Sequence, residues 1–380
     1  MKKIILSAIG LTTLFLVGCK SNHNLEVNNL ELIHETEFGG VYFKCTIDEF
    51  NDLGFEYGDS VNIYFDNDYK ILDLPYYNGY YVDAGERLLV GYPGYDYIKL
   101  AINYGEDCYD IIGLNSDNKA KIELNSKGKY LDIQETMNIQ YKDEREFYDS
   151  DSEFGNYREI SVGNIKPNIL YRGASPCDNK HKRASCVDGL MEESGINFIM
   201  NLADTKEKID SYINQEDFNS PYFLSLYKKN TVLLMSQGYD EKVMPLAMNM
   251  NYKSSEFRSK VAQGFRQLES FDGPYFIHCQ EGKDRTGFVC IVVEALLGAS
   301  YQEIVDDYMY TYKNYYKITL EKDPKRYNII KERNVDAMLE FIVGNNNYKT
   351  IDLVSAARNY LKLGGLEDTI IDSIIEKLTK

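Results

Sequence analysis

Positive charge is scarce in this chain of 380 residues, since 42 lysines and arginines are outnumbered by 59 aspartates and glutamates and the net charge is −17. No basic cluster is long enough to override that excess, which argues against a nucleic-acid-binding surface. The motif Cys-x-x-Cys is missing among the seven cysteines, so the usual signature of a thiol oxidoreductase is absent. Beyond the first 18 residues, no segment is long and apolar enough to span a membrane. Tryptophan is absent altogether.

The length of the chain predicts two domains and a leader. A hydrophobic content of 44% is enough for sizeable cores, and 380 residues are more than one domain usually holds. We expect five segments: a lipoprotein signal peptide (1–18), a tether (19–30), a β-rich accessory domain (31–155), a catalytic domain (156–345) and a C-terminal helical cap (346–380).

The first 18 residues have the pattern of an export signal. Lys2 and Lys3 form a positive start, residues 4–17 are apolar but short for a bilayer span, and Leu16-Val17-Gly18-Cys19 closes the segment. This ending resembles the bacterial lipobox, in which cleavage before the cysteine is coupled to lipidation of its sulfur. The resemblance implies an exported protein, anchored by lipid on Cys19 to the outer face of a bacterial membrane. The alternative is an ordinary signal peptide that contains a cysteine.

Residues 31–155 have the composition of a β-rich domain. Short runs of β-branched and aromatic residues alternate with turns that contain glycine, which favours a small antiparallel barrel or sandwich. No catalytic constellation lies among them, so a scaffold or partner-binding role is favoured. Tyr76, Tyr77, Tyr80 and Tyr81 form either an exposed recognition patch or part of the core. The expected strands are residues 41–47, 60–65, 88–92, 97–102 and 121–124.

The strongest chemical signal is the decapeptide His-Cys-Gln-Glu-Gly-Lys-Asp-Arg-Thr-Gly at residues 278–287. Residues 274–277 before it predict a buried strand, and residues 288–297 after it predict a buried helix closed by Gly298. A loop between a strand and a helix can direct several backbone N–H groups at one point, where the helix dipole adds positive potential. The sequence therefore predicts an anion-binding loop.

Two side chains give that loop its chemistry. Cys279 opens it and Arg285 closes it, with five residues between them. A helix N-terminus beside a guanidinium favours the thiolate, which is the nucleophilic form of cysteine. The guanidinium of Arg285 can bind two phosphate oxygens at once. A nucleophile, an anion cradle and a clamp are therefore expected within a few residues of one another.

Cys-x5-Arg-Thr preceded by His resembles the phosphate loop of the cysteine-dependent protein tyrosine phosphatase superfamily. The ending Gly-Lys-Asp-Arg-Thr-Gly resembles the bacterial branch, whose members also accept phosphoserine/threonine or phosphoinositides. The resemblance covers ten contiguous residues in a strand-loop-helix context. It implies an α/β catalytic domain of the protein tyrosine phosphatase-like layered fold, with a central sheet and surrounding helices, preceded here by a small all-β domain. It requires no metal and no cofactor.

The same resemblance implies a role for each loop residue. Cys279 attacks phosphorus, His278 packs beneath Cys279 and orders the loop, and the Thr286 hydroxyl assists departure of the thiolate. Lys283 contacts the substrate beyond its phosphate. The expected phosphate-binding set is Gln280, Glu281, Gly282, Lys283, Asp284 and Arg285.

Two further features precede the loop in the catalytic domain. The segment Leu170-Tyr171-Arg172-Gly173 resembles the one that leads into the catalytic domain in the bacterial branch. Arg172 either orients the phosphate loop or makes a structural ion pair. The basic run Asn179-Lys180-His181-Lys182-Arg183 is either a recognition loop for an anionic substrate or a solvated loop.

The general acid is not fixed by the sequence. The larger family places an aspartate in a Trp-Pro-Asp loop, and this chain has no tryptophan. The bacterial branch has an aspartate inside the phosphate loop, which here is Asp284. Asp240, in a Gly-containing stretch, and Asp204, at a predicted strand end, are the competitors.

The remaining elements of residues 156–345 alternate between strands and helices, as an α/β layered fold requires. The final segment, 346–380, predicts a helical hairpin, and the tyrosines from Tyr308 to Tyr316 are expected to pack. The expected strands are 197–202, 231–235 and 243–248. The expected helices are 187–194 before Gly195, 254–268, 301–310 after Ser300, 334–343, 350–362 and 366–378.

The cysteines other than Cys19 and Cys279 carry no assigned chemistry. Cys290 falls in the middle of an apolar helix and is expected to be inert core. Outside the cytoplasm disulfides are permitted, so Cys177 and Cys186 either form a bond that closes a short loop or remain free thiols.

The function indicated is hydrolysis of phosphate monoesters through a cysteinyl-phosphate intermediate. The first hypothesis is a protein tyrosine or dual-specificity phosphatase, and the alternative is an inositol phosphate or phosphoinositide phosphatase. The expected partners are a phosphorylated protein or a small phosphorylated metabolite, and a membrane through the N-terminal lipid. A binding module with an inactive loop is disfavoured because Cys279 and Arg285 are both intact. The physiological substrate stays open.

Overall fold

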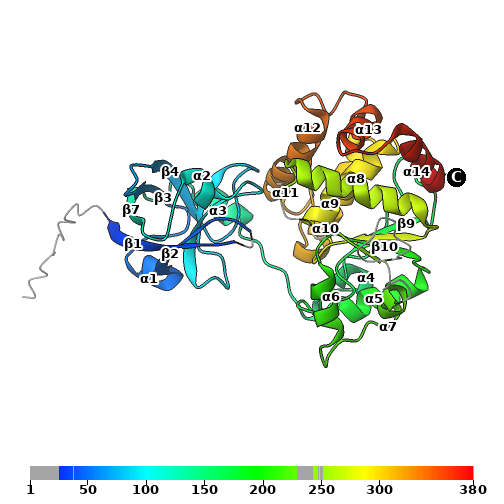
Figure 1. The fold of residues 1–380 in the computed structure, drawn as a ribbon, viewed down its shortest axis with the longest axis horizontal. Helices are drawn as coiled ribbons and strands as arrows, with labels where there is room; N and C mark the ends of the chain where they lie inside the picture. Colours follow the sequence, from blue (N-terminus) through cyan, green and yellow to red (C-terminus); the bar gives the residue numbers. More distant parts are fainter. Residues whose placement is uncertain (1–24, 37, 229–242, 247, 249–250, 380) are drawn as a thin grey trace, which may run out of the picture.

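The protein is described by a computed structural model covering residues 25–36, 38–228, 243–246, 248 and 251–379. Figure 1 shows a β-rich body at the N-terminal side and a larger α/β body formed by the rest of the chain. The signal-peptide and lipidation predictions, including Cys19, lie outside the described residues, as do Asp240 and the strand expected at 231–235. In the described part of the chain, no helix has the length and apolarity needed to cross a bilayer.

The N-terminal body is a closed barrel whose strands follow the order β1-β2-β6-β5-β4-β3-β7. All neighbouring strands are antiparallel except β4 and β5, which are parallel. Side chains alternate along β3, so that Val61, Ile63 and Phe65 point into the barrel core. The strands are β1 (Glu26–His34), β2 (Val41–Thr46), β3 (Ser60–Phe65), β4 (Lys70–Tyr77), β5 (Arg87–Val90), β6 (Tyr97–Ile102) and β7 (Lys119–Ser126). Short helices α1 (Ile47–Asp52), α2 (Cys108–Ile112) and α3 (Leu131–Met137) accompany them.

Two barrel strands differ from the sequence prediction. The expected tether (19–30) includes the start of β1, whose pairing with β7 shifts register between Val27 and Leu30, and Asn29 has φ +56°. This bulge interrupts the alternation that would have marked a strand. β4 was missed because it contains Pro75 and because Asp73 has φ +58°, both of which are unusual within a strand.

The C-terminal body is built on a five-stranded sheet of order β11-β10-β12-β9-β8. Its four longer strands are parallel, and β8 pairs antiparallel at one edge. This confirms the α/β layered architecture preceded by a β domain. The strands are β8 (Arg158–Glu159), β9 (Leu170–Gly173), β10 (Phe198–Asn201), β11 (Val243–Pro245) and β12 (Tyr275–His278).

The two faces of the sheet are buried under different helices because neighbouring residues of a strand point to opposite sides. Ile199 and Phe276 pack with α5 (Ala184–Glu193), α6 (Lys206–Ile213) and α7 (Pro221–Lys228). Phe198, Met200 and Ile277 belong to the larger core on the other face. That core includes α8 (Ser255–Ser270), α9 (Asp284–Leu296), α10 (Tyr301–Tyr316), α11 (Pro324–Lys331), the π turn Glu332–Asp336 and α12 (Ala337–Val343). The turn Arg145–Phe147 lies on the connection between the two bodies, and α4 (Asp151–Phe154) packs against α5 and α10 of the larger body.

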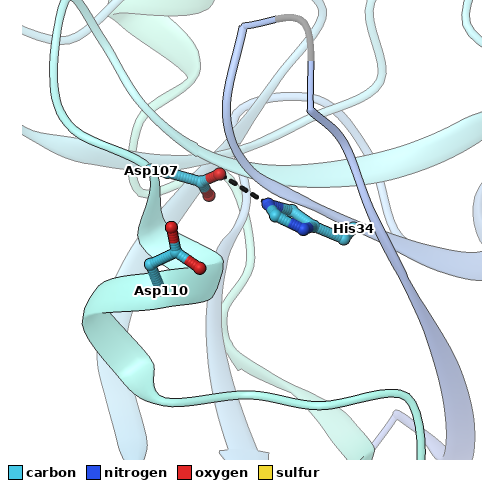
Figure 2. Close-up of side chains that lie close together, drawn as sticks. All are labelled: His34, Asp107 and Asp110. Carbon is cyan, nitrogen blue, oxygen red and sulfur yellow. Dashed lines mark hydrogen bonds and ion pairs between the residues drawn. The ribbon is translucent and has the colours of Figure 1, made fainter.

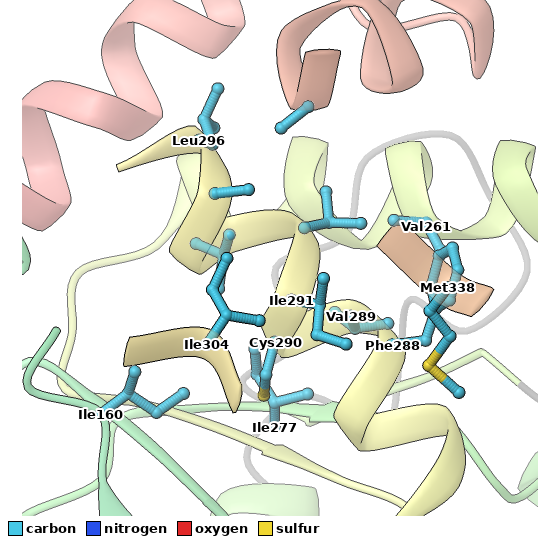
Figure 3. Packing of buried hydrophobic residues seen from close by; sticks show 14 of the residues in the cluster. Ile160, Val261, Ile277, Phe288, Val289, Cys290, Ile291, Leu296, Ile304 and Met338 are labelled. Carbon is cyan, nitrogen blue, oxygen red and sulfur yellow. The ribbon is translucent and has the colours of Figure 1, made fainter. Parts of the chain in front are cut away.

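Helix α9 is buried from Thr286 to Leu296, which explains the nearly uniform apolar sequence after its first turn. In Figure 3, Cys290 lies against Ile277 of β12, while Phe288 lies beside Val261 of α8 and Met338 of α12. The Cys290 thiol is 0% exposed, and burial raises its pKa. This agrees with the expectation of an inert core residue.

The C-terminal segment (346–380) is packed more deeply than a cap. Its helices α13 (Leu353–Leu363) and α14 (Asp368–Thr379) place Ala357, Leu361, Ile371 and Ile374 in the same core as α8 and α9, each with 0% exposure. The apolar positions recur at helical spacing, so one face of each helix is buried against the rest of the domain. These helices are therefore part of the C-terminal body.

Candidate active site

The decapeptide forms the connection between β12 and α9, at the carboxyl end of the middle strand of the sheet. Parallel α/β sheets bind ligands at the carboxyl ends of their strands. His278 is the last residue of β12, Cys279 follows it, and α9 begins at Asp284. Cys279 is 3% exposed, so its sulfur lies at the base of the loop.

The outer side of the loop is held by hydrogen bonds to three successive carbonyls. Those of Gln280, Glu281 and Gly282 accept from the Ser175 N–H (3.1 Å), the Tyr315 hydroxyl (2.8 Å) and Arg172 Nη2 (3.1 Å), respectively. Because these carbonyls point outward, the peptide N–H groups between them point to the opposite side. Within the described residues, the N–H groups of 280–285 have no acceptor. The loop can therefore offer a set of donors to an anion.

Gly282 is required by the geometry. Its φ is +67°, and a Cβ at this position would lie 2.3 Å from the carbonyl carbon and oxygen of Gly173. The loop packs directly on the end of β9 here, which leaves no room for a side chain.

Arg172 fulfils both of the roles that the sequence left open. Its guanidinium is 1% exposed, donates to the Gly282 carbonyl and pairs with Asp307 of α10. Arg158 contacts the same carboxylate at 2.8 Å. Although burial acts to raise the pKa of Asp307, the two arginines hold it below its usual range. The ion pair thus fixes the arginine that supports the loop.

Asn156 supports the same part of the loop from a second direction. Its side-chain Nδ2 donates to the Gly282 carbonyl at 3.2 Å and to the Thr311 hydroxyl at 3.1 Å. Asn156 has φ +48°, a conformation that asparagine tolerates better than most residues.

The guanidinium of Arg285 is aimed by backbone carbonyls. Its Nη1 donates to the carbonyl of Met248 at 3.0 Å, and Leu202 lies at 3.5 Å. Its Nε and the Thr286 hydroxyl are buried without a partner among the described residues. Unpaired buried donors are costly, so both groups are suited to a ligand or thiolate in the loop.

His278 is a neutral, buried support for Cys279. Its Nδ1 lies 3.1 Å from the Cys279 carbonyl, so this nitrogen carries the proton and donates. The ring stacks on Phe276 with centroids 5.5 Å apart. Burial lowers the pKa of His278 to about 3, which keeps the imidazole uncharged.

The described acid candidates differ in their surroundings. Asp284 begins α9, and burial raises the pKa of its carboxyl although Lys283 acts in the opposite direction. Asp204 is 3% exposed; burial also raises its pKa, and its carboxylate accepts from Asn201 Nδ2 (3.0 Å) and the Tyr212 hydroxyl (3.4 Å). Asp284 is therefore the candidate with the less occupied carboxyl, since Asp204 is engaged in its own turn.

Lys283 and Glu281 form a polar cluster at the rim of the loop. Lys283 Nζ lies 3.3 Å from Glu281 and 3.7 Å from Asp284, and 3.5 Å from the Tyr316 hydroxyl. Burial acts to raise the pKa of Glu281, but Lys283 and the hydroxyl of Tyr141, which donates at 2.8 Å, lower it to about 2. Glu281 is thus a fixed anion that neutralises Lys283.

The basic run at 179–183 does not act as a unit. Arg183 is 2% exposed and lies over the rings of Tyr141, Phe154 and Tyr315 at about 5 Å. His181 contacts Asp143 at 3.1 Å. Only Lys180 and Lys182 of this run are exposed. Arg183 is buried by packing and cannot take part in a recognition loop.

Several supporting residues were not identified from the sequence. Ser175, Asn156 and Tyr315 bond the loop from 34 to 126 residues away, and Asp178 accepts from the Gln280 side chain at 2.9 Å. No spacing signal marks these residues, because each reaches the loop through tertiary structure.

The disulfide alternative for Cys177 and Cys186 is wrong, since both are free thiols. Cys177 is buried with its sulfur 3.5 Å from the Ser175 hydroxyl. Cys186 packs in a separate cluster with Tyr141 and Tyr148.

A second group of polar side chains lies in the barrel, where His34, Asp107 and Asp110 come within metal-ligand distance of one another (Figure 2). His34 Nε2 is 2.6 Å from one oxygen of Asp107, and the other oxygen accepts from the N–H groups of Gly40 and Tyr109. Asp107 also serves as the N-cap of α2. These hydrogen bonds give His34 and Asp107 a structural role.

Comparison with known proteins gives one extensive match. A model of the tyrosine phosphatase family aligns with residues 153–379, more than half of the chain, and includes the C-terminal helices. No curated protein matches. An uncharacterized conserved protein from Thermotoga maritima is 21% identical over 26% of this chain and 35% of its own, with a TM-score of 0.21, which is too low to bear on the fold. The chain belongs to the tyrosine phosphatase family.

Proposed function

We propose that this phosphatase is a protein tyrosine, or dual-specificity, phosphatase that works through a covalent phosphate on Cys279. The observation that carries the proposal is that the loop carbonyls of Gln280, Glu281 and Gly282 accept hydrogen bonds on the outer side of the loop. It turns the loop amides toward the point that Cys279 and Arg285 also border. Preorganised donors of this kind stabilise the charge that develops on the equatorial oxygens of a transferring phosphoryl group.

In the first step the Cys279 thiolate attacks phosphorus in line with the ester oxygen. An S–P bond forms, the P–O bond to the substrate breaks, and the leaving oxygen takes the proton of Asp284. In the second step water attacks the same phosphorus and gives a proton to the Asp284 carboxylate. The S–P bond breaks, and the buried Thr286 hydroxyl stabilises the departing thiolate.

The surroundings of the loop favour phosphotyrosine over a polyphosphorylated inositol. Lys283, which would recognise additional phosphates, is already balanced by Glu281 and Asp284. Tyr312 and Tyr316 border the same rim as Lys283. A substrate with one phosphate and an aromatic leaving group fits rings and balanced charge better than a polyanion does.

A direct comparison of substrates tests this preference. We expect kcat/KM for a phosphotyrosine peptide to be about tenfold or more above the value for the same peptide with phosphoserine, and above the value for an inositol phosphate. A factor of this size is typical of an apolar pocket that distinguishes between two substrates. Phosphate release measured at equal enzyme concentration gives the three values. Faster turnover of the inositol phosphate would favour the alternative substrate class.

We also propose that the protein is exported and held on the outer face of a bacterial membrane by lipid on Cys19, with the barrel next to the anchor. The support is the lipobox-like sequence before Cys19. Replacement of Cys19 with alanine is expected to move the protein from the membrane fraction to the soluble fraction, because the acyl chains are lost. Fractionation followed by immunoblotting measures this. Retention of the Cys19→Ala protein in membranes would refute lipidation.

A further inference from the structure

A cleft of about 500 Å³ lies between the barrel and the catalytic body, and the phosphate loop forms part of it. Glu281, Lys283 and Asp284 line one side. The barrel contributes Tyr81, Tyr92 and Tyr104 to the other side. The cleft therefore connects the rim of the loop, at Glu281, Lys283 and Asp284, with a domain that lies outside the matched family segment.

The barrel is fixed in this position by bonds that do not involve the cleft rings. Arg333 donates to the backbone carbonyl of Tyr81 and lies 3.8 Å from Asp83. Lys253 donates to the Ala84 carbonyl at 2.6 Å. On the neighbouring helix α3, the carbonyl of Thr136 accepts from Arg326 of α11 at 2.5 Å. Helix α3 accordingly contacts α11, and Figure 1 shows these two helices on the facing sides of the two bodies.

Tyr104 projects from the barrel into the catalytic body. It packs against the large core of that body, and its ring lies 5.5 Å from that of Tyr252. Its φ of +46° is unusual for an aromatic residue. Burial raises the pKa of Tyr104, with a smaller contribution from the charge on Asp284, and both residues line the cleft.

Tyr92 and Tyr81 complete the barrel side. Tyr92 is 43% exposed and lines the cleft, so its ring is accessible to a ligand there. Burial is the main factor that raises the pKa of the Tyr92 hydroxyl. The charges of Lys283, Glu281 and Asp284 have smaller effects on it. Tyr81 is half-buried, whereas Tyr76 and Tyr77 of the same sequence run are core. The run thus divides into a core pair and residues that line the cleft.

The chemistry of the cleft selects an aromatic ester rather than a polyanion. Its rings come from both bodies, with Tyr312 and Tyr316 across from the barrel tyrosines. In the described lining, the cations Lys283 and Arg333 are matched by the carboxylates of Asp143, Glu281 and Asp284. Rings of this kind hold another ring in offset or edge-to-face contact.

We propose that the barrel is part of the active site, and that Tyr81 and Tyr92 bind the aromatic side chain and adjacent residues of a phosphotyrosine peptide. The inference rests on the proposed phosphatase function, since the phosphate must lie in the loop for its leaving group to reach the cleft. The barrel is then a specificity element, which corresponds to the partner-binding alternative among the two roles expected from its sequence.

The test compares Tyr92→Ala and Tyr81→Ala with Tyr97→Ala, a matched control in the barrel that lies outside the cleft lining. Loss of one aromatic contact is expected to raise KM for a phosphotyrosine peptide by about tenfold in each cleft variant. The inhibition constant of inorganic phosphate, which needs only the loop, is expected to change by less than about twofold. Tyr81→Ala keeps the backbone carbonyl that Arg333 binds.

The outcomes separate this inference from the proposed function. Unchanged KM in both cleft variants, or an equal rise in Tyr97→Ala, overturns the role of the barrel while peptide turnover by the wild-type protein upholds the phosphatase. If the wild-type protein releases no phosphate from any monoester, the proposed function itself fails. Thermal unfolding of each variant excludes loss of the fold as the cause of a raised KM.

Discussion

Replacement of Cys279 with serine is expected to lower kcat for a phosphotyrosine peptide by about 10⁴-fold or more, the scale on which loss of a nucleophile acts. Serine fills the same space at the base of the loop, where Cys279 is 3% exposed. Its hydroxyl, however, is not ionised near neutral pH and cannot replace the thiolate. The donors of the loop depend on Ser175, Tyr315 and Arg172 and remain in place. Phosphate release under single-turnover conditions measures the loss.

The matched control is Cys186→Ser, which makes the same atomic change in a half-buried thiol on α5. This variant is expected to retain wild-type kcat. Cys279→Ser is expected to keep its affinity for inorganic phosphate, because the loop amides and Arg285 are unchanged. Retained turnover in Cys279→Ser would reject the covalent mechanism, and simultaneous loss of phosphate binding would indicate a collapsed loop.

The candidate site could be predicted because its reacting parts are contiguous. Cys279, Asp284 and Arg285 lie within one strand-loop-helix unit, and local geometry dictates what such a unit can hold. The framework around the loop was not predictable in this way. Asn156 reaches Gly282 across 126 residues, and Tyr315 reaches Glu281 across 34. A single sequence has no periodicity that encodes such contacts.

The fold was predicted where alternation or helical spacing is regular, and missed where the backbone departs from it. β3 and β6 have the expected bounds, and α10 begins at Tyr301 with Ser300 as its N-cap, as predicted. α10 extends six residues past the expected end, to Tyr316, because its polar tyrosines still fit a helix until Lys317 adopts φ +57°. The bulge in β1 and the left-handed Asp73 in β4 concealed two strands.

The cleft was not predictable from the sequence either. Tyr81 and Tyr104 are far from the loop in sequence, and the division of the tyrosine run into core and cleft residues depends on how the barrel docks. Docking relies on Arg333 and Lys253 bonding to backbone carbonyls, and backbone acceptors leave no trace in the sequence.

The proposal that Asp284 is the general acid rests on the surroundings of its carboxyl. Burial raises the pKa of its carboxyl above the usual value, with Glu281 acting in the same direction and Lys283 in the opposite one. The acid form therefore persists to a higher pH than in an exposed aspartate. A general acid must carry its proton when the leaving oxygen departs. Activity that depends on this proton is thus present at low pH and lost as pH rises through the raised pKa.

Replacement of Asp284 with asparagine is expected to lower kcat for poor leaving groups, such as a phosphotyrosine peptide, by about 10²–10⁴-fold, and to flatten the acidic-to-neutral pH profile. An ester with a good leaving group should lose much less, because its oxygen departs without a proton. Asp204→Asn is the matched comparison, since Asp204 is also buried with a raised pKa but is engaged by Asn201 and Tyr212. Profiles of kcat against pH for both variants and both esters separate the candidates. An unaltered profile in Asp284→Asn would move the role to Asp204 if that variant flattens it, and otherwise to Asp240, which lies outside the described residues.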